Sequence, residues 1–327
     1  HDLPGELRAA LARKAEGLSR ADAAQRADAI SQTYRSGGGS TRIKTSADAL
    51  AYALARMPGT YAAVAASLNA LMEIDPDFAP QSLLDVGAGP GTATWAASEA
   101  FASLGTFTLL DANAALSDLA KELVRSQPRL ETLRYNSGDA RKVLTEAPEA
   151  DLVVASYVIN ELSESERAAF ADHLWTKARD MLLVVEPGTP AGYAHIIALR
   201  DRLIAKGVHV IAPCPHDAAC PLIAPDWCHF TQRLQRSRMH KHLKGADLPY
   251  EDEKFSYVIL SRTAPAQRPS RVLAQPLVTK IAVAAKICTG DGIKTASFPH
   301  RNKAAYKRAK KWNWGDAIFS GNDAAPE

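Results

Sequence analysis

The spacing of apolar positions along the chain changes near residue 80. Before that point, Ala- and Leu-rich segments with helical spacing are interrupted by a glycine-rich stretch and by a Met-Pro-Gly triplet. The segments are Leu3–Leu18, Ala21–Tyr34 and Ala47–Leu71, and the interruptions are Ser36–Ser40 and Met57–Gly59. Residues 1–78 are therefore expected to form an N-terminal helical extension.

From Gln81 onward, short apolar runs alternate with segments of helix length. The runs are expected to be strands, and they cover Ser82–Val86, Thr106–Asp111, Leu130–Tyr135, Asp151–Ser156 and Met181–Val185. Strands that alternate with helices favour a parallel sheet, because each crossover connection needs a helix. The predicted fold class is α/β, with a Rossmann-like sheet over residues 79–207.

The alternation stops after a helix expected at Ala191–Lys206. Residues 208–250 are rich in Pro, Cys, His and Arg and are interpreted as a basic, metal-binding insertion. Apolar runs return at Phe255–Ser261 and Leu277–Ile287, so residues 251–298 are expected to complete the sheet with antiparallel strands. Residues 299–327 are interpreted as a basic, aromatic tail.

Three glycines follow the first predicted strand at alternate positions. Gly87, Gly89 and Gly91 come directly after Asp85 and Val86. Glycine permits both a tight turn and the close approach of a ligand to the backbone. The alternate spacing differs from the Gly-x-Gly-x-x-Gly of dinucleotide-binding loops and resembles motif I of class I methyltransferases. It predicts S-adenosylmethionine, with Asp85 acting through the loop on the methionine end of the cofactor.

Acidic and amide residues follow the later strands. Asp111 ends the second strand, where a carboxylate can accept both ribose hydroxyls; the less favoured alternative is a turn residue at the strand end. Asp139 follows the third strand and is expected near the adenine amine. Asn160 and Glu161 follow the fourth strand and are candidates for substrate contact and catalysis, although Asn160 could instead cap the next helix. No residue can be identified as a catalytic base from the sequence.

All four cysteines lie beyond residue 213, at Cys214, Cys220, Cys228 and Cys288. Three thiols in a Pro-rich segment and a fourth on a later strand can converge on one tetrahedral metal centre. Zinc folds usually present Cys-x-x-Cys pairs, which are missing here, so the spacing favours a [4Fe–4S] cluster over zinc. In a zinc site His216 or His229 could replace a thiolate, and ordinary free thiols are the remaining alternative.

The two parts of the chain carry opposite charge. Residues 1–212 contain 21 Lys and Arg against 26 Asp and Glu, whereas residues 213–327 contain 18 against 10. A basic C-terminal part is expected to meet a polyanion, and RNA is favoured over a merely solvated surface. Tyr306, Trp312 and Trp314 could stack on unpaired bases or pack on the protein body. The predicted RNA-binding residues are Arg233, Arg236, Arg238, Lys241, Lys244, Lys303, Lys307, Arg308, Lys310 and Lys311.

The sequence gives no support for a membrane role. No apolar run approaches the roughly 20 residues that a membrane-spanning helix needs. The first residues lack the apolar core of a secretory signal, so the expected compartment is the bacterial cytoplasm, or the mitochondrial matrix for an organellar protein.

Taken together, several motifs resemble those of the methyltransferase-like assembly factors of the small ribosomal subunit. The motifs are the glycine loop, the Cys-Pro-His and Cys-Pro-Leu turns, and the segment Trp227–Phe230 followed by Gln232 and Arg233. The resemblance extends from about Arg42 to Lys311. It implies a class I methyltransferase fold, a [4Fe–4S] cluster held by the four cysteines, and association with small-subunit ribosomal RNA. It does not imply catalytic turnover.

The sequence therefore supports three hypotheses about function. The first is a small ribosomal subunit assembly factor that binds S-adenosylmethionine, an iron–sulfur cluster and ribosomal RNA. The second is an active ribosomal RNA methyltransferase with Asn160 and Glu161 at the substrate. The third is a zinc-containing methyltransferase of a small molecule or a protein.

Overall fold

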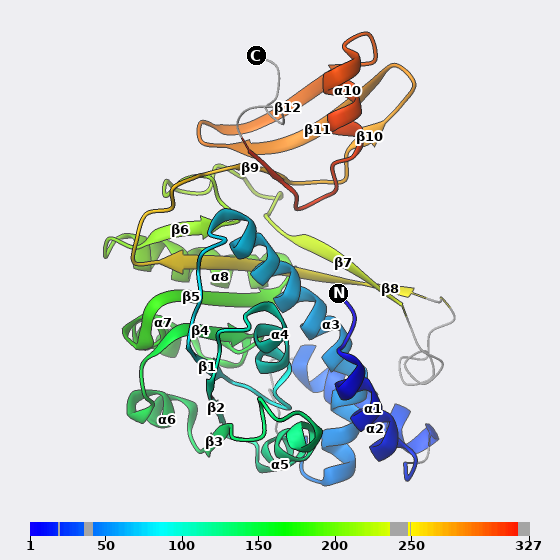
Figure 1. Ribbon diagram of the computed structural model, residues 1–327, viewed down its shortest axis with the longest axis vertical. Helices are drawn as coiled ribbons and strands as arrows, with labels where there is room; N and C mark the ends of the chain where they lie inside the picture. The colour runs from blue at the N-terminus through cyan, green and yellow to red at the C-terminus, as the bar shows by residue number, and fades with distance from the viewer. Residues whose placement is uncertain (19, 36–41, 236–247, 249, 320–327) are drawn as a thin grey trace.

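The computed structural model describes residues 1–18, 20–35, 42–235, 248 and 250–319 (Figure 1). A Rossmann-like domain forms the larger part of the molecule, and a smaller β-sheet with one helix lies against it. Arg236, Arg238, Lys241 and Lys244, which the sequence nominates for RNA contact, lie outside the described residues.

The larger sheet has eight strands, of which seven follow the order β3-β2-β1-β4-β5-β8-β6. Strands β1 to β5 are parallel, β8 runs antiparallel between β5 and β6, and β7 pairs with the first half of β8. The predicted parallel α/β sheet is therefore confirmed. The strands are β1 (Ser82–Val86), β2 (Thr106–Asp111), β3 (Arg134–Ser137), β4 (Ala150–Ser156), β5 (Ala178–Pro187), β6 (His209–Ala212), β7 (Phe230–Gln235) and β8 (Tyr250–Ser261).

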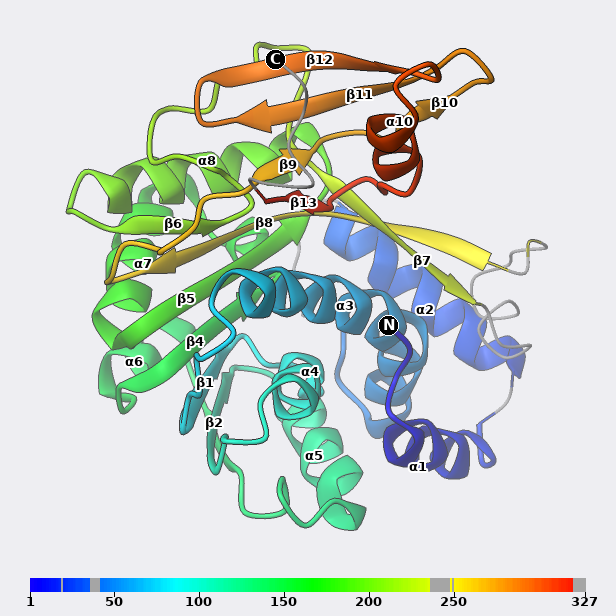
Figure 2. The ribbon, with the colours of Figure 1, turned by 45° about the horizontal axis from the view of Figure 1, so that its top comes forward.

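Buried residues alternate between the two faces of this sheet, so each strand contributes to two cores. In β1, Leu83 faces one core and Leu84 faces the other, and in β4 Leu152 and Val153 do the same. Figure 2 shows a helical layer on each side. The first layer is α1 (Gly5–Ala15), α3 (Ser46–Ile74), α4 (Thr92–Ala100) and α5 (Ala114–Leu123), with α2 (Arg20–Arg35) beside α3. The second layer is α6 (Ala140–Glu146), α7 (Glu164–Lys177) and α8 (Pro190–Ile204), and the short 3₁₀ turns are η1 (Val124–Ser126) and η2 (Ile159–Glu161).

Helix α3 runs unbroken through the Met-Pro-Gly triplet, so the break expected there is wrong. Pro58 removes one backbone donor inside the helix, which usually costs about 3 kcal/mol. Tertiary packing offsets this cost, because Met57 is buried in the first core and Gly59 lets the Glu253 carboxylate approach the helix. A Cβ at Gly59 would lie 2.3 Å from Glu253 Oε2.

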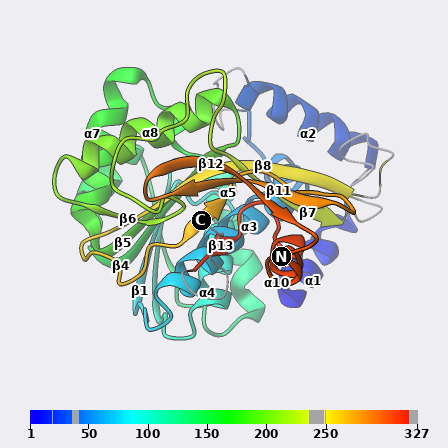
Figure 3. The same cartoon turned by 90° about the horizontal axis from the view of Figure 1, so that it is seen from above.

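The C-terminal strands form a second sheet of five strands with a core of its own (Figure 3). The expectation that residues 251–298 finish the first sheet is correct for β8 and wrong for the later strands. Buried and half-buried positions mostly alternate along β11, and the buried side packs on helix α10. Strand β11 pairs with β12 as a hairpin and does not join the first sheet. The elements are β9 (Ser270–Val272), β10 (Leu277–Val278), β11 (Ala282–Thr289), β12 (Gly292–Pro299), α10 (Lys303–Lys310) and β13 (Ala317–Ile318).

In the part of the chain that the structure describes, no helix combines the length and the apolar character needed to cross a membrane.

Candidate functional site

The glycine loop borders a pocket at the carboxyl ends of β1, β2 and β4. The strand order reverses at β1, and open α/β sheets bind their ligands at such a switch point. The pocket encloses about 770 Å³, including space open to solvent. We call it the glycine pocket, and its lining includes Tyr52, Arg56, Met57, Thr60, Gly87, Ala88, Gly89, Pro90, Thr92, Asp111, Ala112, Leu116, Ala140, Ser156, Tyr157, Val158 and Glu161.

The three glycines of the loop adopt backbone conformations that favour glycine. Their φ angles are +68° at Gly87, +53° at Gly89 and +89° at Gly91. A Cβ at Gly87 would lie 2.2 Å from Cγ2 of Val158, so the loop lies directly against the segment that follows β4. Gly91 caps the start of α4 and does not line the pocket.

Asp85 lies beneath the loop rather than in the pocket. Its Oδ2 accepts hydrogen bonds from the Thr94 backbone N–H at 3.1 Å and from the Thr94 hydroxyl at 2.8 Å. The side chain is fully buried, and burial raises the pKa of this carboxyl to about 7. Asp85 therefore fixes the first turn of α4 to β1 and positions the loop indirectly.

Asp111 both lines the pocket and holds the turn after β2. It accepts the Gly89 N–H at 2.7 Å and the Asn113 N–H at 3.0 Å, and burial raises the pKa of its carboxyl. Asp139, by contrast, is exposed and caps α6 by accepting backbone N–H groups of that helix, whereas its neighbour Ala140 lines the pocket. The predicted adenine contact of Asp139 stays a prediction.

An ion pair that carries no sequence signature closes the α3 side of the pocket. Arg56 Nη2 lies 2.8 Å from Glu253 Oε1 of β8, and the Tyr157 hydroxyl donates to the same oxygen at 3.1 Å. Tyr157 has φ +58°, which is rare for a residue with a bulky side chain. Arg56 and Glu253 are almost 200 residues apart in sequence, so no local motif could predict their ion pair.

The candidate catalytic residues lie in η2, beside the pocket. Glu161 lines the pocket. The Asn160 backbone N–H donates to Oε1 of the buried Glu186 at 2.8 Å, and burial raises the pKa of Glu186 to about 8. The residue that caps the following helix α7 is Ser163, so the alternative that Asn160 caps it is wrong. Glu186 therefore helps to hold the η2 turn at the pocket edge.

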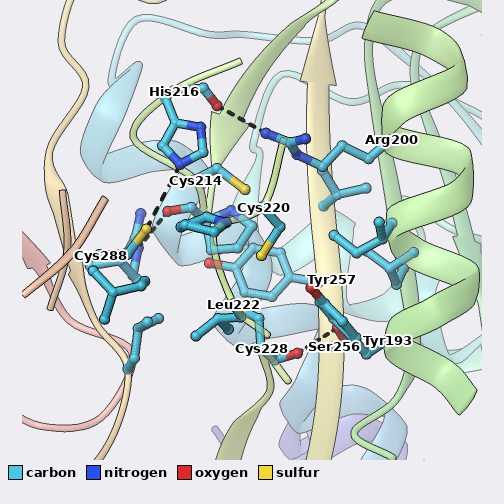
Figure 4. Close-up of a pocket in the computed structure, with 18 residues that line it drawn as sticks. Tyr193, Arg200, Cys214, His216, Cys220, Leu222, Cys228, Ser256, Tyr257 and Cys288 are labelled. Atoms are coloured by element: carbon cyan, nitrogen blue, oxygen red, sulfur yellow. Dashed lines mark hydrogen bonds between the residues drawn. The ribbon is translucent and has the colours of Figure 1, made fainter. Parts of the chain in front are cut away.

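The four cysteines line a second pocket, between α8, β8 and the second sheet (Figure 4). Cys214, Cys220 and Cys228 belong to the segment between β6 and β7, and Cys288 belongs to β11. The space measures about 500 Å³, part of it open to solvent. We call it the thiol pocket, and its lining includes Tyr193, Ile196, Ile197, Arg200, Pro213, Cys214, His216, Cys220, Pro221, Leu222, Cys228, Ser256, Tyr257, Val258, Arg271, Leu273, Cys288 and Ile293.

The thiols share a pocket without forming a coordination shell. Among the described residues, no three His, Cys, Asp or Glu side chains are arranged around one metal position. Cys288 Sγ lies 3.9 Å from His216 Nε2, and burial, with smaller contributions from Cys214 and Cys220, raises the pKa of the Cys288 thiol to about 12. The structure thus brings the four predicted ligands to one pocket.

The segment that carries Cys228 is held by aromatic stacking and hydrogen bonds. The Ser256 hydroxyl donates to the Cys228 carbonyl at 3.0 Å, and the Trp227 indole donates to the Gly188 carbonyl at 3.0 Å. His229 stacks on Trp227 with ring centroids 4.4 Å apart. It does not line the thiol pocket, whereas His216 does.

Two buried arginines also line the thiol pocket. Arg200 of α8 and Arg271 of β9 are each 1% exposed. Arg200 donates to the carbonyls of His216 and Ala218, and Arg271 donates to the carbonyls of Pro213 and Gly315. Sequence reasoning missed both, because a single arginine gives no sign that it is buried.

The basic residues of α10 are presented to solvent. Lys303, Lys307 and Lys310 are exposed at helical spacing, as predicted, and no described carboxylate pairs with them. The aromatic residues of this region pack on the protein instead of being free to stack on bases. The Tyr306 hydroxyl donates to the Thr279 carbonyl, Trp312 contacts the Phe298 ring, and the Trp314 indole donates to the His229 carbonyl.

Arg233 is already engaged within the protein. It pairs with Asp252 at 2.9 Å across the β7–β8 ladder, and its guanidinium lies 4.0 Å from the centroid of the Tyr250 ring. Its role in RNA binding stays a prediction.

The sheet order and the glycine pocket at its switch point define the class I methyltransferase fold. Residues 46–319 match the family model described as mitochondrial small ribosomal subunit Rsm22, and this match includes the glycine loop and all four cysteines. The chain therefore belongs to the Rsm22 family.

Two curated relatives are named for mitochondria. The human protein called mitochondrial ribosome assembly protein METTL17 is 31% identical over 290 residues, which are 82% of this chain and 62% of that protein. A fission yeast protein, Rsm22-cox11 tandem protein 2 of Schizosaccharomyces pombe, is 25% identical over 335 residues, 85% of this chain and 44% of that protein. The chain thus spans less than two thirds of the length of either relative.

Solved methyltransferase structures are more distant. Magnesium protoporphyrin IX methyltransferase of Synechocystis with bound S-adenosylmethionine is 13% identical with a TM-score of 0.42, covering 71% of this chain and 90% of that one. An O-methyltransferase family protein of Burkholderia thailandensis is 15% identical with a TM-score of 0.42, covering 71% and 63%.

Proposed function

We propose that this protein is an assembly factor of the small ribosomal subunit that binds S-adenosylmethionine, a [4Fe–4S] cluster and small-subunit ribosomal RNA. The observation that carries the proposal is the Rsm22 family match, which spans both pockets and the basic helix α10. Both relatives are mitochondrial proteins by name, which supports the mitochondrial matrix as the proposed compartment.

The residues of the glycine pocket fit S-adenosylmethionine. Gly87 and Gly89 bring backbone, rather than side chains, to the ligand, and α4 begins directly after the loop. Asp111 already accepts two N–H bonds, but a carboxylate offers about four lone-pair positions and so can also accept from ribose hydroxyls. When bound, the cofactor would supply an activated methyl group.

The residues of the thiol pocket fit an anionic metal–thiolate group. Arg271 is buried, and its hydrogen bonds go to neutral backbone carbonyls, with no described carboxylate paired to it. A buried cation is costly unless an anion accompanies it. Four cysteines line the same pocket, and metal binding converts thiols to thiolates. Thiolate donors are typical of zinc and iron–sulfur centres, and we favour the cluster because the Cys-x-x-Cys pairs typical of zinc folds are missing from the sequence.

Such a centre would fasten the second sheet to the Rossmann-like domain. Three of the proposed ligands come from the segment after β6, and the fourth, Cys288, comes from β11 of the second sheet. The same sheet packs on α10, whose lysines face solvent. The cluster therefore has a structural role in this proposal, because it fixes the position of a basic surface.

That basic surface is the proposed RNA contact. Residues 270–319 contain ten Lys and Arg but two Asp and no Glu. Lys303, Lys307 and Lys310 lie on one face of α10, rising about 1.5 Å per residue, a row suited to successive phosphates of one strand.

The test is RNA binding at several salt concentrations, with fragments of small-subunit ribosomal RNA and anaerobically purified protein. Replacing Lys303, Lys307 and Lys310 with Gln is expected to weaken binding and to reduce the slope of log affinity against log salt by about two to three. The matched control replaces the exposed Lys121, Arg134 and Arg141 with Gln. It should leave the slope of log affinity against log salt unchanged. Equal slopes for both triple variants would contradict the proposed RNA surface.

The position of Glu161 in the glycine pocket favours one second candidate, an active ribosomal RNA methyltransferase. It predicts methyl incorporation into immature small-subunit RNA that is lost in Gly89→Arg. RNA binding without methyl incorporation would leave the assembly factor as the function. One zinc and no iron, together with the lack of salt-sensitive RNA binding, would instead support a zinc-containing methyltransferase of a small molecule or a protein.

A further inference from the structure

The thiol pocket contains two buried donor atoms that make no hydrogen bond of normal geometry to the described protein, although the Arg200 guanidinium lies near enough to the Cys214 thiol to lower the pKa that burial raises. Nε of Arg200 and Nη2 of Arg271 are shielded from solvent and make no hydrogen bond to any described residue. Buried polar atoms without partners are rare and costly, typically about 1–3 kcal/mol each. The two atoms come from different elements, α8 and β9, and the side chains that carry them line one pocket.

The charge of these side chains is also incompletely matched. Arg200 pairs with Asp201 at 2.8 Å, but that carboxylate is 47% exposed, so water shares the interaction. Arg271 has hydrogen bonds to carbonyl oxygens alone. It is also the cross-strand partner of Cys288, which places a buried cation beside a proposed ligand. Two buried cations thus border the space that the four thiols border.

We propose that Arg200 and Arg271 are the counter-charges of the metal–thiolate group: their free N–H atoms donate to its sulfur atoms, and their charges offset a dianion. This inference rests on the metal centre of the proposed function. A [4Fe–4S]²⁺ core with four thiolates is a dianion, and its inorganic sulfides offer additional acceptors for N–H donors. Hydrogen bonds to sulfur and nearby charge are among the factors that set cluster potentials.

A neighbouring positive charge stabilises the reduced, more negative form of a cluster and therefore raises its reduction potential. The experiment is a redox titration of anaerobically purified protein, followed by electron paramagnetic resonance, with Arg271→Gln, Arg271→Lys, Arg200→Gln and Arg200→Lys. We expect the Gln variants to shift the midpoint potential to more negative values and the Lys variants to stay closer to the wild type.

Arg262→Gln is the matched control. Arg262 also donates to two backbone carbonyls, those of Ala178 and Trp175, but it does not line the thiol pocket. It should leave the potential unchanged. Gln variants that retain iron and keep the wild-type potential would overturn the inference. If the Gln variants do not load iron, loading restored in the Lys variants supports a role of charge, whereas equal failure of Lys and Gln supports a purely structural role.

The metal analysis of the wild type separates this inference from the proposed function. One zinc and no iron would contradict the cluster but not the counter-charges, because a zinc ion with four thiolates is also a dianion. The arginines are then tested by the rate at which a chelator removes zinc. Several-fold faster loss from Arg271→Gln than from Arg271→Lys supports the inference, and equal rates of loss contradict it.

Discussion

The glycine pocket is marked in the sequence by one loop motif after β1, whereas no single motif marks the thiol pocket. Gly87 and Gly89 follow β1 directly, and Asp111 ends the neighbouring strand. The thiol pocket joins α8, the segment after β6, β8 and the second sheet. A local motif thus defines the first site, and tertiary structure defines the second. Strand β8 borders both, with Glu253 near one pocket and Ser256 and Tyr257 at the other.

The largest expected effect is the loss of the metal in Cys288→Ser. This change removes the thiol that the second sheet supplies, and incomplete ligand sets bind structural metals poorly. Iron and zinc analysis should find the metal absent. Calorimetric titration with S-adenosylhomocysteine should find an affinity within about twofold of the wild type, because the described lining of the glycine pocket takes nothing from the second sheet. Thr295→Ser, at an exposed position of β12, is the control. A large loss of cofactor affinity in Cys288→Ser would show that β8 transmits changes between the pockets.

Gly87→Ala is expected to have a smaller effect, which impairs the glycine pocket and leaves the thiol pocket unchanged. The added Cβ would meet Val158 at 2.2 Å in a left-handed backbone conformation, which costs on the order of 1–3 kcal/mol of stability. Binding of S-adenosylhomocysteine should be lost while the metal content stays that of the wild type. Gly105→Ala is the control, because its Cβ would meet nothing within 4 Å. Retained cofactor binding in Gly87→Ala would argue that the ligand does not use this loop.

The smallest expected effect is a gain in stability in Asp85→Asn. Burial raises the folded-state pKa of Asp85 to about 7 from 3.8, so the folded protein holds a proton that the unfolded chain releases. The protonated carboxyl contributes to the stability of the folded state. This contribution is fully present below pH 3.8 and is lost as the pH rises through about 7. The amide of the variant stays neutral at every pH, and its oxygen can still accept the Thr94 hydrogen bonds. Thermal unfolding should therefore find the variant more stable by on the order of 2 kcal/mol at pH 8, and by less at pH 5.

Asp118→Asn, at an exposed position of α5, controls for the removal of one negative charge. An Asp85→Asn variant that is less stable than the wild type at pH 8 would mean that the charged carboxylate is required beneath the glycine loop.

The sequence predicted the features of the fold that local patterns determine. Alternating apolar runs located β1, β2, β4 and β5, and the glycine spacing located the first pocket, because each depends on neighbouring residues. The continuity of α3 through Pro58 was not predictable, since it depends on the packing of Glu253 against Gly59. The second sheet was missed for a similar reason: a half-buried strand pattern does not specify which sheet the strand joins.

The candidate sites show the same division. The clustering of cysteines in sequence indicated a shared site. The tertiary structure alone shows that Arg200, Arg271 and Tyr193 line the same pocket. The Arg56–Glu253 ion pair likewise joins α3 to β8 across the fold. Residues with a motif could be nominated from the sequence, whereas residues defined by burial could not.

The position of Cys288 also has a consequence for the timing of synthesis. The first three cysteines leave the ribosome together, whereas Cys288 follows Cys228 only after 60 further residues. Domains generally fold in the order in which they are made, so the Rossmann-like domain can form before β11 exists. The proposed four-thiolate centre could close only after β11 has been synthesised, and a nascent chain that stops before β11 would retain three open thiols and no stable metal.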